Sequence, residues 1–513
     1  MNIRRLSWVL AAALLLSLLF GCGSTKPVPT PADCGVVEGM ISHTSASNYM
    51  YADTEGVVST QNALFVPAGT VISCEQAMAV YTYDEYNTLN TKLLASVGQN
   101  VIATYVVVMA PGTLTITEDA YIRLSVRGSL TDVSVTYPAE RQAEVTVYDP
   151  VYEAYGKDYD RILPLINRAE GGAVNYIFLT DVHNDLSSNS DAQDASLKQQ
   201  VEAAVKLANE SNAIDFIVIG GDNTSGQYGD KATTLQYTHA LFEPLKSCKK
   251  PVLMLMGNHD DNSYKYAIQP YNAAMAANLV SKVNWNKEIL TTYSPATIVH
   301  DSQNANSAYY YYDLAEKKTR LICLDAIDYE QQTDENGDIL VESLTKNAEG
   351  NTNVGRSCYG YSARQLRWLA NEALTAAEGW NYIFFSHMNA QESQRYGTEL
   401  RELIAAFQNR TTYVSDELGT VDFTAATGSV MLYQYGHVHV ERITEDTALG
   451  LWRVATGSAN IAQLTNNKKG SETYRAFGTD SESCFDILSV TKDKAVKYAF
   501  GAGSDVELLS PQK

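Results

Sequence analysis

The amino-acid sequence predicts an α/β fold that is preceded by a small all-β domain. Within residues 173–500, short continuous apolar runs alternate with segments in which apolar residues recur every three or four positions. Short continuous runs are typical of buried strands, whereas the three-to-four repeat is typical of amphipathic helices. Within residues 34–147, short segments rich in Val, Thr and Tyr are separated by Gly and Pro turns. They show no helical repeat, which favours an antiparallel β-sandwich.

The length of 513 residues indicates more than one domain. We expect a signal peptide at 1–21, a linker at 22–33, a β-sandwich-like domain at 34–147, a connector at 148–172, the α/β domain at 173–500 and a tail at 501–513. A hydrophobic content of 45% and a charged content of 19% exclude a largely disordered chain. The formal net charge of -21 repels polyanions, so nucleic acid is not an expected partner.

The N-terminus has the features of a targeting segment. Arg4 and Arg5 precede an apolar stretch over residues 8–20, which has the length of a secretory signal and is short for a membrane span. The stretch runs into the sequence LFGC, which ends at Cys22 and resembles the lipobox of bacterial lipoproteins. That resemblance implies cleavage before Cys22, lipid modification of Cys22, and an extracytoplasmic protein anchored to a bacterial membrane in the cell envelope. The alternative is an ordinary secretory signal in which Cys22 has no role.

The β-sandwich-like domain has two possible roles. Its strands are expected at residues 56–59, 64–66, 101–108, 114–117, 121–126 and 133–137. The domain either spaces the α/β domain from the membrane or binds a glycan. Tyr81, Tyr83 and Tyr86 would suit sugar stacking, but alternate tyrosines are equally typical of an ordinary β-surface. Because extracytoplasmic proteins often form disulfides, Cys34 and Cys74 are a plausible pair.

The α/β domain shows a regular alternation of strands and helices. Helices are expected over residues 197–208, 366–377 and 400–407. Strand–helix–strand repetition implies parallel strands with right-handed crossovers. Near the C-terminal end the pattern changes, and antiparallel strands of a second sheet are expected at 450–455, 484–490 and 495–500. Two long insertions, 261–308 and 333–356, are expected to overhang a functional site, since long loops in compact domains are often functional.

Acidic, amide and histidine side chains follow five of the expected strands. The five segments are Asp181-Val182-His183, Gly221-Asp222-Asn223, Gly257-Asn258-His259-Asp260, His387 and Gly436-His437-Val438-His439. In open α/β sheets, ligands bind at the carboxyl ends of the strands, so we expect these side chains to share one rim. Because alternate residues of a strand share a face, both members of a DxH or HxH pair can point towards a metal. Carboxylate, amide and imidazole groups without a thiolate suit Mn, Fe or Zn, and the set describes a two-metal hydrolytic centre.

The ordered motifs DxH, GD, GNHD, H and GHxH resemble those of the calcineurin-like metallophosphoesterase family over about residues 175–496. The resemblance implies a two-sheet metallophosphoesterase sandwich flanked by helices, with two divalent metal ions. It implies that each ion has three ligands of its own and one shared ligand. These are Asp181, His183 and His439 for the first ion, Asn258, His387 and His437 for the second, and Asp222 as the bridge.

The resemblance also implies a reaction. We expect hydrolysis of a phosphate mono- or diester by a metal-bridging hydroxide, with His259 as the general acid that protonates the leaving group. Asp260 either orients His259 or orients a ligand, and the sequence leaves this open. The expected substrate is a small-molecule, lipid or cell-wall phosphoester. The sequence contains no GxSxG motif and no P-loop, which argues against serine hydrolysis and nucleotide binding by such a loop.

A second function from another class stays open. The protein would then be a surface adhesion or glycan-binding lipoprotein whose phosphoesterase body is structural or weakly active. Metal content and turnover of a generic phosphoester distinguish the two hypotheses.

Overall fold

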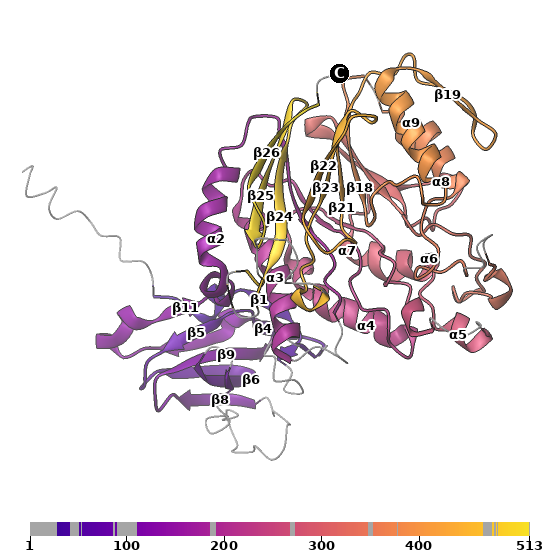
Figure 1. The fold of residues 1–513 in the computed structure, drawn as a ribbon. Helices are drawn as coiled ribbons and strands as arrows, with labels where there is room; N and C mark the ends of the chain where they lie inside the picture. Colours follow the sequence, from indigo (N-terminus) through magenta and orange to yellow (C-terminus); the bar gives the residue numbers. More distant parts are fainter. Residues whose placement is uncertain are drawn as a thin grey trace, which may run out of the picture. The chain divides into compact units, whose positions relative to one another are not determined.

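The computed structural model describes residues 28–41, 51–52, 54–85, 88–89, 110–184, 191–266, 272–346, 352–376, 378–464, 475–476, 479 and 481–511. The chain divides into two compact units, Met1–Pro150 and Val151–Lys513 (Figure 1). Cys22, the expected signal peptide and the expected strand at 101–108 lie outside the described residues. Among the helices of the described segments, none combines the length and the apolar character needed to cross a bilayer.

The first unit is built on a nine-stranded sheet with β6 (Val71–Glu85) as its longest strand. The other strands of this sheet are β1 (Val36–Glu38), β4 (Val57–Thr60), β5 (Ala63–Val66), β7 (Thr88–Leu89), β8 (Ala110–Thr115), β9 (Ala120–Arg127), β10 (Val133–Thr136) and β11 (Thr146–Tyr148). β2 (Met40–Ile41) and β3 (Tyr51–Ala52) form a separate antiparallel pair. A register irregularity between Cys74 and Met78 divides β6. Its first part pairs with β10 and most of β8, its second part pairs with β9 and β7, and both parts contribute to one apolar core.

Two expectations for the first unit are wrong. Tyr81 was expected to be exposed, either for sugar stacking or as part of an ordinary β-surface, but it is fully buried, and its hydroxyl donates a hydrogen bond to the carbonyl oxygen of Ile41 at 3.2 Å. Cys34 and Cys74 are both buried free thiols and do not form the plausible disulfide. The side chain of Tyr83 and the whole of Tyr86 lie outside the described part of the chain.

The second unit contains two large sheets. The six-stranded sheet has the order β14 (Val252–Met254), β13 (Phe216–Ile219), β12 (Val174–Leu179), β24 (Cys484–Val490), β25 (Lys494–Gly501) and β26 (Val506–Leu509). The seven-stranded sheet has the order β15 (Val299–His300), β16 (Tyr310–Leu314), β17 (Thr319–Leu324), β18 (Asn381–Ser386), β21 (Val430–Tyr435), β23 (Leu451–Ala455) and β22 (Arg442–Asp446). Strands β12, β13 and β14 are parallel, as are β17, β18, β21 and β23.

The C-terminal strands do not all belong to one sheet, contrary to expectation. β24 and β25 pair antiparallel in the six-stranded sheet, whereas β23 is a parallel strand of the seven-stranded sheet. β26 extends the six-stranded sheet into the segment that was expected to be a tail.

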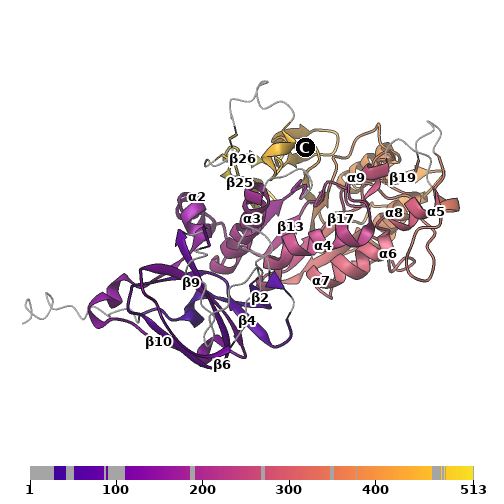
Figure 2. The ribbon, with the colours of Figure 1, turned by 90° about the horizontal axis from the view of Figure 1, so that it is seen from below.

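Helices lie around both sheets. The longer ones are α2 (Pro150–Ile166), α3 (Asp191–Glu210), α4 (Lys231–Phe242) and α9 (Gly397–Asn409). α8 (Ala363–Trp368) continues into the π-helical turn η9 (Leu369–Ala373), so the expected helix at 366–377 is present in a shorter form. α3 contacts β12 and β13, and Figure 2 shows α3 and α4 side by side. A short hairpin of β19 (Thr412–Ser415) and β20 (Gly419–Asp422) follows α9.

The described residues of the insertion at 261–308 include several short helical segments. It contains η5 (Ser263–Tyr266), α5 (Ala273–Ala277), α6 (Lys282–Trp285), the π-helical turn η6 (Asn286–Leu290) and α7 (Thr291–Tyr293). The remaining short turns are η1 (Pro31–Cys34), η2 (Leu130–Asp132), η3 (Ala139–Glu144), η4 (Glu243–Ser247), η7 (Ala315–Lys317), η8 (Val341–Ser343) and η10 (Ile461–Gln463).

The two sheets of the second unit pack against each other through aromatic side chains. Phe385 of β18 meets the ring of Tyr176 of β12 edge-on, with ring centroids 5.1 Å apart. Phe385 also contacts Phe216 of β13 at 5.9 Å. Because these contacts join the inner faces of both sheets, the loops that follow β12, β13, β18 and β21 are brought to a common edge.

Candidate metal centre

Each expected site residue lies just beyond the carboxyl end of a buried parallel strand. Asp181 and His183 follow β12, Asp222 follows β13, Asn258 and His259 follow β14, His387 follows β18, and His437 and His439 follow β21. The strands are almost wholly buried, because they are covered on both faces, and only their ends present polar side chains. The centre therefore draws on loops from both sheets.

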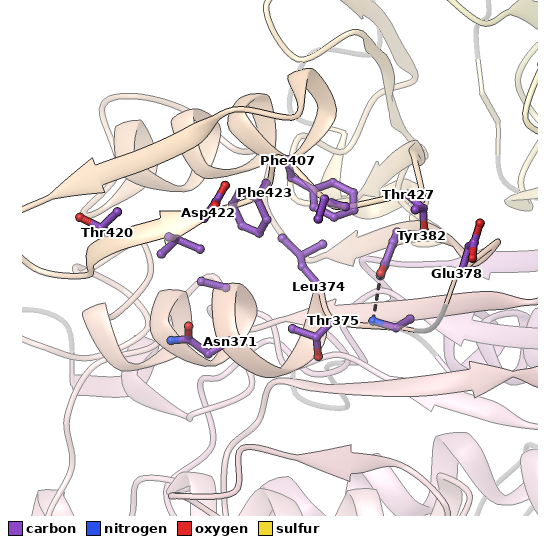
Figure 3. Close-up of a pocket in the computed structure, with 15 residues that line it drawn as sticks. Asn371, Leu374, Thr375, Glu378, Tyr382, Phe407, Thr420, Asp422, Phe423 and Thr427 are labelled. Atoms are coloured by element: carbon purple, nitrogen blue, oxygen red, sulfur yellow. Dashed lines mark hydrogen bonds between the residues drawn. The ribbon is translucent and has the colours of Figure 1, made fainter.

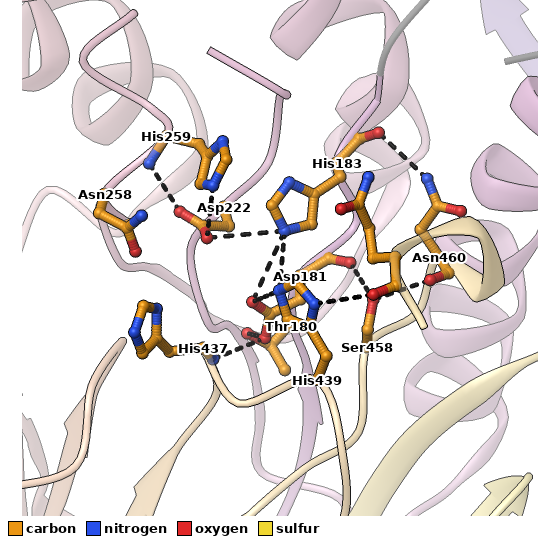
Figure 4. Close-up of polar contacts among 12 residues, drawn as sticks. Thr180, Asp181, His183, Asp222, Asn258, His259, His437, His439, Ser458 and Asn460 are labelled. Carbon is orange, nitrogen blue, oxygen red and sulfur yellow. Dashed lines mark hydrogen bonds and ion pairs between the residues drawn. The ribbon is translucent and has the colours of Figure 1, made fainter. Parts of the chain in front are cut away.

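The structure brings these side chains into two groups that share one residue (Figure 4). The first group is Asp181, His183, Asp222 and His439, and the second is Asp222, His387 and His437. Within each group the possible ligand atoms all lie within 4.8 Å of one another. Asp222 belongs to both groups, as a bridging carboxylate must.

Short distances define the second group. Nε2 of His387 lies 3.1 Å from Oδ2 of Asp222 and 3.1 Å from Oδ1 of Asn258. The amide of Asn258 is oriented by Tyr264, because its Nδ2 donates a hydrogen bond to the Tyr264 hydroxyl at 2.9 Å. This bond turns the amide oxygen, which is the atom that can bind a cation, towards His387.

The first group has equally close contacts. Nε2 of His183 lies 3.1 Å from Nε2 of His439 and 3.6 Å from Oδ2 of Asp222. Nε2 of His439 lies 3.3 Å from Oδ1 of Asp181. Two imidazole nitrogens and two carboxylates that converge in a buried space are a typical ligand set for a transition-metal ion.

The donor set fits divalent cations. Oδ1 of Asp181 and Oδ2 of Asp222 are buried, and within the described segments no donor other than the neighbouring imidazole nitrogens reaches them. A buried acceptor that lacks a partner is costly, and a cation would satisfy it. Nδ1 of His439 and Nδ1 of His387 face the carbonyl oxygens of Gln463 and Gly220, at 3.2 and 2.8 Å. Since a carbonyl oxygen only accepts, both Nδ1 atoms carry a proton, and Nε2 is the nitrogen that faces the ligand group.

Burial keeps two of the histidines neutral. It lowers the pKa of His183 to about 3 and that of His437 to about 4. Burial also opposes the charged form of His387, but Asp222 at 3.1 Å outweighs it and raises the pKa of His387 to about 9. His183 and His437 can therefore bind a cation at neutral pH without losing a proton.

We expected strand alternation to turn both members of each ligand pair towards the metals. The pairs do face the centre, but a different backbone conformation places them there. Both β12 and β21 end before the pairs begin, and Asp181, His183, His437 and His439 have positive φ angles of 54°, 44°, 67° and 60°. Left-handed backbone is uncommon for residues other than glycine and persists where surrounding structure imposes it. The two motifs thus have the expected ligands, but an irregular turn rather than a pleated strand positions them.

Asp260 fixes the loops that carry Asp222 and Asn258. Its carboxylate accepts hydrogen bonds from the backbone N–H groups of Gly257 at 2.7 Å, Asn223 at 2.8 Å and Asp222 at 3.0 Å. Burial, followed by the charge of Asp222, raises the pKa of Asp260 to about 7. A Cβ atom at Gly257 would lie 2.2 Å from the backbone nitrogen of Asp222, so only glycine permits this approach. The role that the sequence left open for Asp260 is therefore loop positioning.

Two residues that sequence reasoning missed support the first group. Oγ of Ser458 donates a hydrogen bond to the carbonyl oxygen of Asp181 at 2.7 Å, and Nδ2 of Asn460 donates one to the carbonyl oxygen of His183 at 3.1 Å (Figure 4). Both residues follow β23, which is another parallel strand ending at the same rim. Recognition of residues 451–455 as a parallel strand would have drawn attention to them.

His259 is held with one nitrogen directed at the centre. Nδ1 lies 2.6 Å from the carbonyl oxygen of Ser225, so Nδ1 donates, while Nε2 lies 3.9 Å from Oδ2 of Asp222. The ring of Tyr264 stacks on His259 with centroids 3.5 Å apart and an interplanar angle of 16°. The free Nε2 can exchange a proton with a group bound next to Asp222.

One cavity lies away from the two ligand groups. It has a volume of about 570 Å³ and lies among η9, α9 and the β19–β20 hairpin (Figure 3). Tyr382, Phe407 and Phe423 line it, and none of its lining residues belongs to the two ligand groups. The chemistry of the polar centre is thus separate from this cavity.

Part of the second unit is similar to a known protein family. Residues 174–391 match the calcineurin-like phosphoesterase family. A solved dimetal phosphatase from Danio rerio is 15% identical, with a TM-score of 0.42, and the match covers 66% of this chain and 99% of that one. A purple acid phosphatase from yellow lupin (Lupinus luteus) is 12% identical, with a TM-score of 0.36 and coverages of 87% and 73%. No curated protein matched the sequence significantly. Residues 174–391 are thus similar to calcineurin-like phosphoesterases, and the two ligand groups of the second unit form a candidate dinuclear metal centre.

Proposed function

We propose that this protein hydrolyses a phosphate mono- or diester outside the cytoplasm, at the centre around Asp222. One ion would be held by Asp181, His183 and His439, and the other by Asn258, His387 and His437, with Asp222 shared. The observation that carries this assignment is the position of the Asp222 carboxylate in both ligand groups. The neutral oxygen of Asn258 limits the negative charge that an anionic substrate meets.

When bound, two divalent ions would stabilise the phosphoryl group as Lewis acids and lower the pKa of the attacking water. The water oxygen forms the new bond to phosphorus, and the ester P–O bond breaks. His259 then donates a proton from Nε2 to the departing oxygen. The carbonyl of Ser225 supports this step because it keeps Nδ1 protonated and leaves Nε2 directed at the site.

The experiment that tests this function measures the metal content per chain and the turnover of phosphoesters in the same preparation. The purified protein, loaded with Mn²⁺ or Zn²⁺, is assayed with an aryl phosphate, its diester and a panel of nucleotides, lipid phosphates and cell-wall phosphodiesters. We expect two ions per chain and turnover of at least one ester. Two ions per chain with turnover of none would favour the alternative, a glycan-binding or adhesion lipoprotein with a structural body.

We further propose that a lipid on Cys22 anchors the protein to a bacterial membrane outside the cytoplasm. Arg4, Arg5 and the apolar stretch that ends in LFGC support this location. Cys22→Ser should abolish lipid labelling and move the protein out of the membrane fraction. A wild-type protein that is wholly released and begins at another residue would contradict the anchor.

A further inference from the structure

The positively charged side chain of Arg356 lies near the proposed general acid His259, and the ring of Tyr264 contacts both. Tyr264 stacks on His259 with ring centroids 3.5 Å apart, and Cζ of Arg356 lies 4.8 Å from the centroid of the same Tyr264 ring. Because the imidazole covers one face of the tyrosine, the guanidinium occupies the other. Tyr264 therefore contacts both the imidazole of His259 and the guanidinium of Arg356.

The backbone around Arg356 is fixed against the GNHD segment. The N–H of Gly355 donates to Oδ2 of Asp261 at 2.6 Å, and the N–H of Arg356 donates to Oγ of Ser263 at 2.9 Å. A Cβ atom at Gly355 would lie 2.6 Å from the carbonyl oxygen of Asn258, so this glycine permits the loop to touch the metal-site segment. The second insertion therefore brings Arg356 to a defined place at the centre's rim.

The guanidinium of Arg356 is available for a ligand. The side chain is exposed, and within the described part of the chain no carboxylate forms an ion pair with it. Arginine offers several N–H donors in a planar fork, which suits carboxylate and phosphate oxygens. Tyr359, three residues later, packs edge-on against His437 with centroids 5.5 Å apart, so the same loop also lines the second ligand group.

We propose that Arg356, supported by Tyr264, binds a second anionic group on the leaving group of the substrate. This inference rests on the proposed role of His259, since the group that receives a proton from Nε2 must lie against that imidazole. A leaving group that extends from His259 past Tyr264 meets Arg356. The substrate class is therefore a phosphoester whose alcohol carries a carboxylate or a further phosphate, and the common feature is an oxyanion.

The test compares three two-carbon phosphoesters that differ only at the far end of the leaving group. Ethyl phosphate is neutral there, phosphoglycolate carries a carboxylate, and ethylene glycol bisphosphate carries a phosphate. In the metal-loaded protein, Arg356→Gln should lower kcat/KM about tenfold or more for whichever anionic ester the wild type prefers, mainly by raising KM. Ethyl phosphate turnover and metal content should stay unchanged. Lys265→Gln is the matched control, because it removes an exposed cation next to Tyr264 in sequence.

Two results would overturn the subsite. Arg356→Gln could slow all three esters equally, or it could slow none of them. Binding of phosphonopropionate and propylphosphonate, measured by calorimetry, separates this inference from the proposed function because it needs no turnover. The wild type should prefer phosphonopropionate, and Arg356→Gln should remove the preference. Equal affinities in the wild type contradict the subsite, whereas preference without hydrolysis of any ester contradicts only the hydrolytic function.

Discussion

The side chain of Asp260 fixes the backbone of Asp222: Oδ2 of Asp260 accepts a hydrogen bond from the N–H of Asp222 at 3.0 Å. The same oxygen accepts a bond from the N–H of Gly257 at 2.7 Å, so one carboxylate joins the loops after β13 and β14. Asp260 thereby sets the distance between the shared ligand Asp222 and the amide ligand Asn258.

Asp260→Asn should weaken both folding and metal binding. An asparagine amide would turn its NH₂ group towards N–H donors and leave at least one of them unsatisfied. Such a loss costs about 1–3 kcal/mol of unfolding free energy. Denaturant unfolding and metal analysis measure the two effects. Asp230→Asn, at the exposed N-cap of α4, is the control and should change neither. Unchanged stability and metal content in Asp260→Asn would contradict the positioning role.

Asp222→Asn should remove most bound metal and nearly all activity, because no other residue belongs to both ligand groups. The measurement is elemental analysis of the purified variant together with aryl phosphate turnover. Asp325→Asn is the matched control: Asp325 is also buried after a parallel strand, but it pairs with Lys282 at 2.6 Å. That variant should lose stability and keep its metal. Retention of two ions by Asp222→Asn would refute the bridge.

His259→Ala should keep near-normal metal content while turnover falls by about 10²–10⁴-fold, the usual contribution of a general acid. The loss should be largest for alkyl esters, whose leaving groups need the proton, and smaller for a nitrophenyl ester. Asn258→Ala is the comparison, since it should lower metal occupancy and slow all esters alike. Equal slowing of good and poor leaving groups by His259→Ala would remove the acid role.

Tyr264→Phe should separate the two contacts of this tyrosine. Phenylalanine can still stack on His259, but it cannot accept the hydrogen bond from Asn258. Because partners of metal ligands typically contribute about 10–100-fold to affinity, we expect the second ion to bind that much more weakly. Metal titration measures this, and Tyr293→Phe, whose hydroxyl contacts His239, is the control. A changed leaving-group dependence with normal metal affinity would contradict the separation.

Metal binding to the metal-free protein should depend on pH. His387 has its pKa raised to about 9 by Asp222 against the effect of burial, so at neutral pH a cation must displace its proton. Affinity for the second ion should therefore rise about tenfold per pH unit as pH increases towards 9. His183 and His437 lose their protons near pH 3 and 4 and add no slope. Calorimetry in two buffers should detect proton release at pH 7, and a flat affinity between about pH 6 and 8 would contradict this account.

The location of the centre could be predicted because the strand ends are encoded locally. Each ligand follows a short apolar run, and parallel strands bring such ends to one edge whatever the intervening sequence. The two helices at 197–208 and 400–407 were predictable for a similar reason, since an apolar face with a helical repeat needs only neighbouring residues. These features depend on periodicity rather than on distant contacts.

The features that were missed depend on contacts between distant segments. The positive φ angles at Asp181 and His439 are imposed by tertiary packing and leave no periodic signal. Tyr264 and Arg356 come from two insertions whose paths only the fold reveals. Tyr81 sits in an alternating strand, and alternation alone does not say which face is buried.

The division of the ligands between sheets has a consequence for the lifetime of the protein. Asp181, Asp222 and Asn258 belong to loops of the six-stranded sheet, whereas His387 and His437 belong to the seven-stranded sheet. A metal ion bound by ligands from both loops would link the two sheets. Because it binds the folded state, it would stabilise that state against unfolding. Loss of the metal would then make the protein easier for proteases to degrade, in addition to abolishing its hydrolytic activity. The supply of trace metals in the surroundings would thus govern how much of this protein persists.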